Sequence, residues 1–191
     1  MKKGRLEAFS DGVIAIIITI MVLEFKVPQG GDLAALQTLG PTFCCYVLSF
    51  VMLGIYWNNH HHLFQAVEHV GGGVLWANIH LLFWLSLVPL ATAWMGEYHS
   101  QSLPVALYGA VLFMSATAYT VLVKALLKHH GKNSTLAKAL GSDRKGKISW
   151  LLYVAAMPLA FVSPLLAGAV YVSVACIWLV PDRRIEKVLG A

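Results

Sequence analysis

The chain has 191 residues, of which 58% are hydrophobic and only 12% carry a charge. Soluble domains carry about 25% charged residues, so this chain has too few charges to cover a water-exposed surface. The formal net charge is +5, and the lysines and arginines cluster between apolar runs, a pattern typical of membrane proteins rather than nucleic-acid-binding ones. The composition therefore predicts an all-α membrane protein, built as a single transmembrane domain over residues 1–191.

Four apolar runs in the first two thirds of the chain are long enough to cross a bilayer, which takes about 20 mostly apolar residues. They are roughly Phe9–Phe25, Leu39–Trp57, Val74–Met95 and Leu103–Leu127. Polar stretches separate them, and we expect the segment 58–62 to stop the second span. The basic stretch 128–147 then predicts a loop with a short surface helix near residues 135–140.

The last apolar stretch, Ile148–Val180, has no charged residue and is too long for one span but short for two. Pro164 divides it, because a residue that precedes proline avoids the helical conformation. Lysine and arginine favour the cytoplasmic side. Six spans place the basic N-terminus, the loop 128–147 and the tail at 183–187 all on that side, whereas five spans would not. We therefore predict six spans in the cell membrane, with both termini in the cytoplasm and the last two spans forming a short hairpin.

The first apolar helix has one uniform face. At about 100° per residue, Ile16, Thr19, Ile20 and Leu23 project on the same side. Asp11 points about 140° away from Ile16, toward other helices of the same subunit. An ionisable residue at the hydrocarbon boundary indicates function, although a lipid-facing row of isoleucines and a helix-capping Asp11 would also fit this pattern.

Three stretches resemble the transmembrane-protein-175 family of potassium channels. The first is Arg5-x-x-x-Phe9-Ser10-Asp11-Gly12, followed by an isoleucine-rich helix that contains Thr19. The second is Trp57-Asn58-Asn59-His60-His61-His62-Leu63-Phe64. The third runs from Asn78 through Leu85-Ser86-Leu87-Val88-Pro89 to Gly96-Glu97-Tyr98. One set occurs here, and in this family a single-repeat prokaryotic member is a homotetramer.

The resemblance implies that four copies of the first helix surround an ion path. Ile16, Ile20 and Leu23 would then form hydrophobic constrictions, and Thr19 would add a hydroxyl. The sequence contains no Thr-Val-Gly-Tyr-Gly filter, so selectivity for K⁺ would rest on a dewetting constriction. The family pattern also implies a structural network that braces the first helix against the second and third. Its expected members are Arg5, Phe9, Ser10, Asp11, Trp57, His60, His61 and Asn78.

Two other functions fit the pattern less well. A proton-coupled secondary transporter would use Asp11 with His60 or His61 as a relay, but we find no internal repeat of the kind many carriers have. A non-conducting scaffold is the third option. No nucleotide-binding, serine-hydrolase or zinc-protease motif occurs, so we expect no enzyme.

Consecutive histidines point 100° apart on a helix, so His60, His61 and His62 do not converge on one metal ion. We therefore expect no cofactor and no metal other than permeating K⁺. The expected partners are lipid and further copies of the chain, and no nucleic acid.

Overall fold

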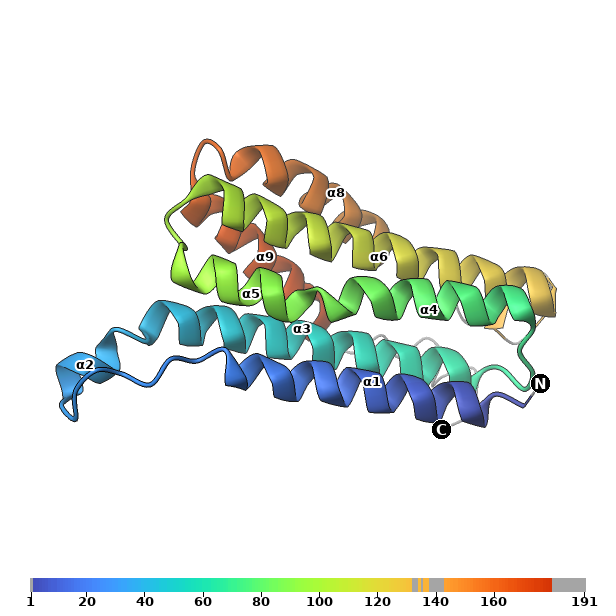
Figure 1. Ribbon diagram of the computed structural model, residues 1–191. Helices are drawn as coiled ribbons and strands as arrows, with labels where there is room; N and C mark the ends of the chain where they lie inside the picture. The colour runs from blue at the N-terminus through green and yellow to red at the C-terminus, as the bar shows by residue number, and fades with distance from the viewer. Residues whose placement is uncertain (1, 132–133, 135, 138–142, 180–191) are drawn as a thin grey trace.

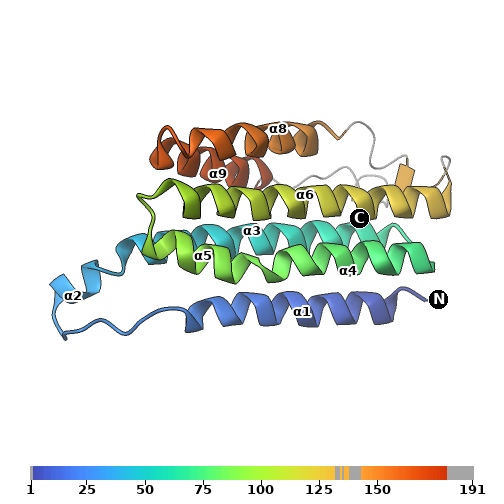
Figure 2. The ribbon, with the colours of Figure 1, turned by 45° about the horizontal axis from the view of Figure 1, so that its top comes forward.

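The computed structural model describes residues 2–131, 134, 136–137 and 143–179, and this part of the chain is helical with one isolated β-bridge between Lys2 and His69. Figures 1 and 2 show the helices lying roughly side by side in a long bundle. Their bounds are α1 Gly4–Leu23, α2 Leu33–Gln37, α3 Gly40–Gln65, α4 Gly72–Ser86, α5 Val88–Glu97, α6 Ser102–His130, α8 Arg144–Leu159 and α9 Pro164–Leu179.

Four stretches of the described chain are long and apolar enough to cross a membrane. They are α1, α3, α6 and the combined segment Gly72–Glu97, which joins α4 to α5. All four coincide with the first four predicted spans. The all-helical class predicted from composition is therefore confirmed for the described residues, in which four helical stretches are candidate membrane spans by length and composition.

Two boundaries differ from the prediction. The segment 58–62 was expected to stop the second span, but α3 continues through it to Gln65. Polar side chains do not prevent the backbone hydrogen bonds of a helix from continuing. Here His60 bonds Asn78 and His61 bonds Gln65, so the polar side chains are accommodated along α3. The third span is interrupted at Leu87, which separates α4 from α5. Pro89 explains the interruption, because proline has no N–H and its ring clashes with the preceding turn.

The helices α8 and α9 have 16 residues each, so at 1.5 Å per residue each is about 24 Å long. That length is shorter than the roughly 30 Å hydrocarbon core. They form the predicted hairpin, with α9 beginning at Pro164. Most of the expected surface helix near 135–140 and the whole tail at 180–191 lie outside the described residues.

The bundle is layered, with α1 at one edge. Figure 2 shows α1 below α3, α4 and α5, and the α8–α9 pair on the opposite side, beyond α6. The contacts agree, since α1 packs on α3, α4 and α5, while α6 packs on α4, α5, α8 and α9. A buried cluster ties the middle layer together, with Thr92 donating to Ser49 Oγ (2.7 Å), which also bonds the Tyr108 hydroxyl (2.9 Å). Among the described residues, α1 is thus covered only on the side that faces α3, α4 and α5.

Candidate functional site

The helix α1 has two opposite faces with different surroundings. Its buried residues are Leu6, Ser10, Ile14, Ile17 and Met21. The opposite face carries the aliphatic row predicted from the helical wheel. Ile16 is 58% exposed, Ile20 42% and Leu23 77%. Within the described part of one subunit, this row is therefore largely uncovered.

Thr19 lies on the exposed face among these aliphatic side chains. Its hydroxyl is directed back to its own helix and lies 3.1 Å from the Ala15 carbonyl oxygen and 3.0 Å from that of Ile16. Because the proton is donated to the backbone, the lone pairs of the Thr19 oxygen remain available as acceptors. The exposed face of α1 therefore carries aliphatic groups and one hydroxyl oxygen that can accept a hydrogen bond.

A buried chain of hydrogen bonds joins the covered face of α1 to α4 and α3. Ser10 donates to the Leu6 carbonyl (2.8 Å) and accepts from Asn78 Nδ2 (2.9 Å). Asn78 Oδ1 in turn accepts from His60 Nε2 (2.8 Å). All three side chains are at most 1% exposed. A buried network of this kind fixes the relative position of its helices, because an unmade bond inside it is costly.

A second, more accessible chain begins at Asp11. Its Oδ1 accepts from Trp57 Nε1–H at 3.0 Å. The Trp57 ring stacks on His61, with centroids 6.0 Å apart and an interplanar angle of 15°. His61 Nε2 accepts from the Gln65 amide at 2.9 Å. Asp11 thus faces α3 of its own subunit, away from the aliphatic row.

The structure does not bring every expected network residue together. Arg5 is exposed, and no hydrogen bond or ion pair to it occurs within the described residues. Phe9 is 58% exposed and projects on the same side of α1 as Ile16. Both side chains point away from the covered face, so neither braces α1 within one subunit.

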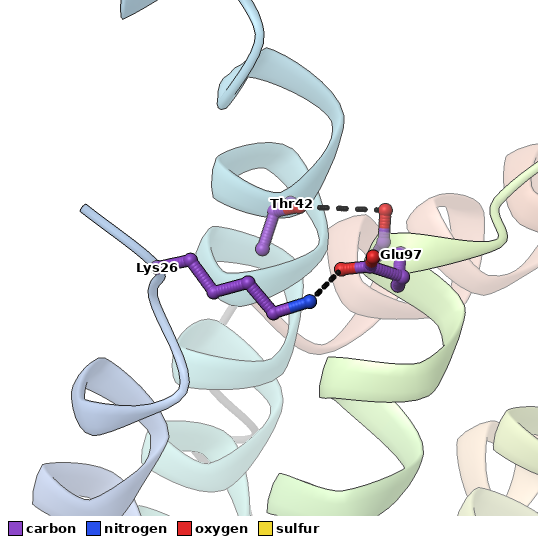
Figure 3. A network of polar contacts seen from close by, with 4 residues as sticks. Lys26, Thr42 and Glu97 are labelled. Carbon is purple, nitrogen blue, oxygen red and sulfur yellow. Dashed lines mark hydrogen bonds and ion pairs between the residues drawn. The ribbon is translucent and has the colours of Figure 1, made fainter. Parts of the chain in front are cut away.

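The sequence interpretation missed how both ends of α1 are held. At its N-terminal end, Lys3 Nζ donates to the Phe64 carbonyl near the end of α3, where a positive charge is favourable. Just beyond its C-terminal end, Lys26 Nζ forms an ion pair with Glu97 Oε2 at 3.0 Å (Figure 3).

The ion pair borders an open cavity of about 340 Å³ at the end of the bundle where α1 terminates. Lining residues come from the segment after α1 and from α2, α3 and α5, and they include Glu24, Lys26, Thr42 and Glu97. No group of three or more His, Cys, Asp or Glu side chains that could hold a metal ion occurs in the described part of the chain.

Known proteins are similar to this chain over part or nearly all of its length. The sequence model of a family described as "Endosomal/lysosomal potassium channel TMEM175" matches residues 5–89. A protein of Chryseobacterium sp. (strain P1-3), named a potassium channel, is 57% identical over 189 residues, which cover 99% of this chain and 98% of the relative.

Two further comparisons extend the match to a solved structure and to an animal protein. The crystal structure of a lysosomal potassium-selective channel TMEM175 homolog from Chamaesiphon minutus superposes with a TM-score of 0.81 at 30% identity, over 94% of this chain and 97% of that one. The Mus musculus protein named endosomal/lysosomal proton channel TMEM175 is 30% identical over 84% of this chain, which spans 36% of that protein.

Proposed function

The chain belongs to the TMEM175 family, and from this premise we propose that it forms a potassium-selective ion channel in the cell membrane. The observation that carries the proposal is the exposed row Ile16, Ile20 and Leu23 on α1, with the Thr19 hydroxyl among them. Aliphatic side chains that line a water-filled path are in unfavourable contact with water. Where they narrow the path enough, water is excluded, and a hydrophobic constriction gates ion flow in this way.

The path needs more than one subunit, since a single helix encloses nothing. Closed cyclic symmetry is the usual solution, and we propose a homotetramer with four copies of α1 at its axis. Within each subunit α1 is covered on one side by α3, α4 and α5, which leaves the opposite side for the axis. A monomeric mass in detergent together with full ion flux would refute this arrangement.

The same proposal includes six spans and the orientation. The helices α8 and α9 would complete the subunit as a short membrane hairpin, with the basic residues at Arg144, Lys145 and Lys147 at the cytoplasmic surface. Lys2, Lys3 and Arg5 lie at the same surface, so both ends of the chain would be cytoplasmic. The subunit would thus be one six-helix domain.

Selectivity would arise at the narrowest ring, and Ile16 is the candidate for that position. Methyl groups replace no water ligand, so an ion that sheds water more easily crosses with a lower barrier, and K⁺ sheds water more easily than Na⁺. An asparagine at this ring would bring an amide dipole into the path and let water stay.

The experiment compares two neighbouring positions of α1 in liposomes or planar bilayers. We expect Ile16→Asn to raise conductance and to bring the K⁺/Na⁺ bi-ionic reversal potential toward zero. Ile17 is 4% exposed and packs inside the subunit, so Ile17→Asn should reduce folded yield without opening the path. If Ile17→Asn alters selectivity while Ile16→Asn leaves it unchanged, α1 is rotated from the proposed orientation.

Proton conduction is a second candidate, because the mouse relative is named a proton channel. The bonds around the acidic residue do not favour the relay that a proton-coupled carrier would need. Asp11 accepts from Trp57, whereas His60 bonds Asn78, so the two titratable groups have separate partners. Reversal potentials that follow the K⁺ gradient at fixed pH support the potassium channel, and potentials that follow the pH gradient at fixed K⁺ support the proton channel.

A further inference from the structure

The outer end of α1 is attached to two other helices just beyond its last aliphatic residue. The Phe25 ring meets the Tyr46 ring of α3 edge-on, with centroids 5.2 Å apart. Lys26 then reaches across to Glu97, the last residue of α5 (Figure 3). Thr42 of α3 donates to the carbonyl of Gly96 at 3.4 Å, so the same turn of α5 is held from both sides.

These contacts matter because Leu23 has little packing of its own. It is 77% exposed and ends α1, so its position depends on what holds the residues that follow it. Lys26 is three residues further along the chain, and its partner stands at the end of α5, beyond the interruption at Leu87. The outer turn of α1 is therefore positioned by α5 through one ion pair and by α3 through the contacts of the Phe25 ring with Tyr46 and Phe43.

We propose that Lys26 and Glu97 are positioning residues that set the outer ring at Leu23, and this inference rests on the proposed channel function. Neither side chain belongs to the ion path. The ion pair is exposed, with side-chain exposures of 78% and 49%, so it biases the position of the turn and does not lock it. Exposed pairs of this kind shift an equilibrium by up to about fivefold and are weakened by salt.

Any neutral or basic substitution of Glu97 also removes a negative charge near the outer end of the path, and that change alone could alter the ion current. A control that removes a charge without removing the ion pair is therefore needed. Glu24 lines the same cavity as Glu97 and forms no ion pair within the described residues. Glu24→Gln and Glu97→Gln therefore remove the same charge from the same end of the protein. Only the second substitution removes the partner of Lys26.

The first measurement is hydrogen exchange of the assembled protein, read on the amides between Ile20 and Gln29. We expect Glu97→Gln and Lys26→Gln each to speed exchange about two- to fivefold at low salt, with a smaller effect at high salt. Glu24→Gln should leave the rates unchanged. The charge-reversed pair Lys26→Glu with Glu97→Lys should return exchange to the wild-type rate.

The second measurement is the current and K⁺/Na⁺ reversal potential of the same variants. Both should change in Glu97→Gln relative to Glu24→Gln and recover in the charge-reversed pair, whereas a purely structural contact would leave the reversal potential unmoved. Equal effects of Glu97→Gln and Glu24→Gln, or a charge-reversed pair that behaves like the single variants, would overturn the proposal. Wild-type protein that carries no K⁺ current would instead refute the channel function, while the exchange rates would still test the contact.

Discussion

Removing the Asn78 side chain tests the buried network most directly, because Asn78 connects its two neighbours. Its Oδ1 accepts from His60 and its Nδ2 donates to Ser10. In Asn78→Ala the His60 donor, which is 1% exposed, loses its partner, and an unsatisfied buried donor costs about 1–3 kcal/mol. Ser10 keeps its bond to the Leu6 carbonyl and loses only the hydrogen bond that it accepts from Asn78. A hydrogen bond between membrane helices contributes on average about 0.6 kcal/mol to stability. We therefore expect Asn78→Ala to lower the free energy of unfolding by about 1.5–3.5 kcal/mol.

The assay is unfolding in mixed micelles with an increasing fraction of denaturing detergent, followed by tryptophan fluorescence. Gln65→Ala is the control, because its bond to His61 is exposed and should be worth less than about 0.5 kcal/mol. In the double variant with His60→Ala, the combined loss of stability should be smaller than the sum of the two single losses. The difference should be about 0.6 kcal/mol and at most about 1.7 kcal/mol, the mean and the maximum for hydrogen bonds between membrane helices. An Asn78→Ala protein as stable as the control, or strictly additive losses, would refute the reasoning.

Two further substitutions probe other contacts. Asp11→Ala should reduce the yield of assembled protein while leaving the reversal potential unchanged, because Asp11 bonds Trp57 and faces away from the aliphatic row; stable assemblies with an altered reversal potential would place Asp11 against the ions. A Cβ at Gly109 would collide with the Tyr171 hydroxyl and lie 2.8 Å from its Cζ, so Gly109→Ala should cost about 1–3 kcal/mol in the same unfolding assay. Gly168→Ala is its control, since a Cβ there meets nothing within 4 Å, and a similar loss for both would contradict the argument.

The long apolar elements were predictable because hydrophobic length is a local property of the sequence. The first four spans and the hairpin at Pro164 follow from it directly. The end of α3 was not predictable in the same way. The polar side chains of His60 and His61 indicate different surroundings, but they do not stop the helical backbone, which continues to Gln65. The interruption at Leu87 is visible in the sequence only as Pro89, which identifies a possible break but not its position.

Among site residues, the orientation of α1 followed from the helical period alone, and the aliphatic row is exposed as the wheel predicts. The family resemblance supplied the network residues, yet it also included Arg5 and Phe9, whose side chains are exposed and lie away from the covered face of α1. The ion pair between Lys26 and Glu97 joins residues 71 positions apart. No periodicity connects such residues, and only the packing of α1 against α5 brings them together.

The hydroxyl of Ser10 has a consequence for how the protein is made. During synthesis α1 enters the bilayer before Asn78 exists, since Asn78 follows Ser10 by 68 residues. The bond from Ser10 to the Leu6 carbonyl satisfies the hydroxyl proton within α1 itself, so the newly inserted helix carries no orphaned donor at that position. When α4 later enters, the same oxygen accepts from Asn78, and nothing made earlier has to be broken. Ser10 thus serves first the insertion of a lone helix and then its docking.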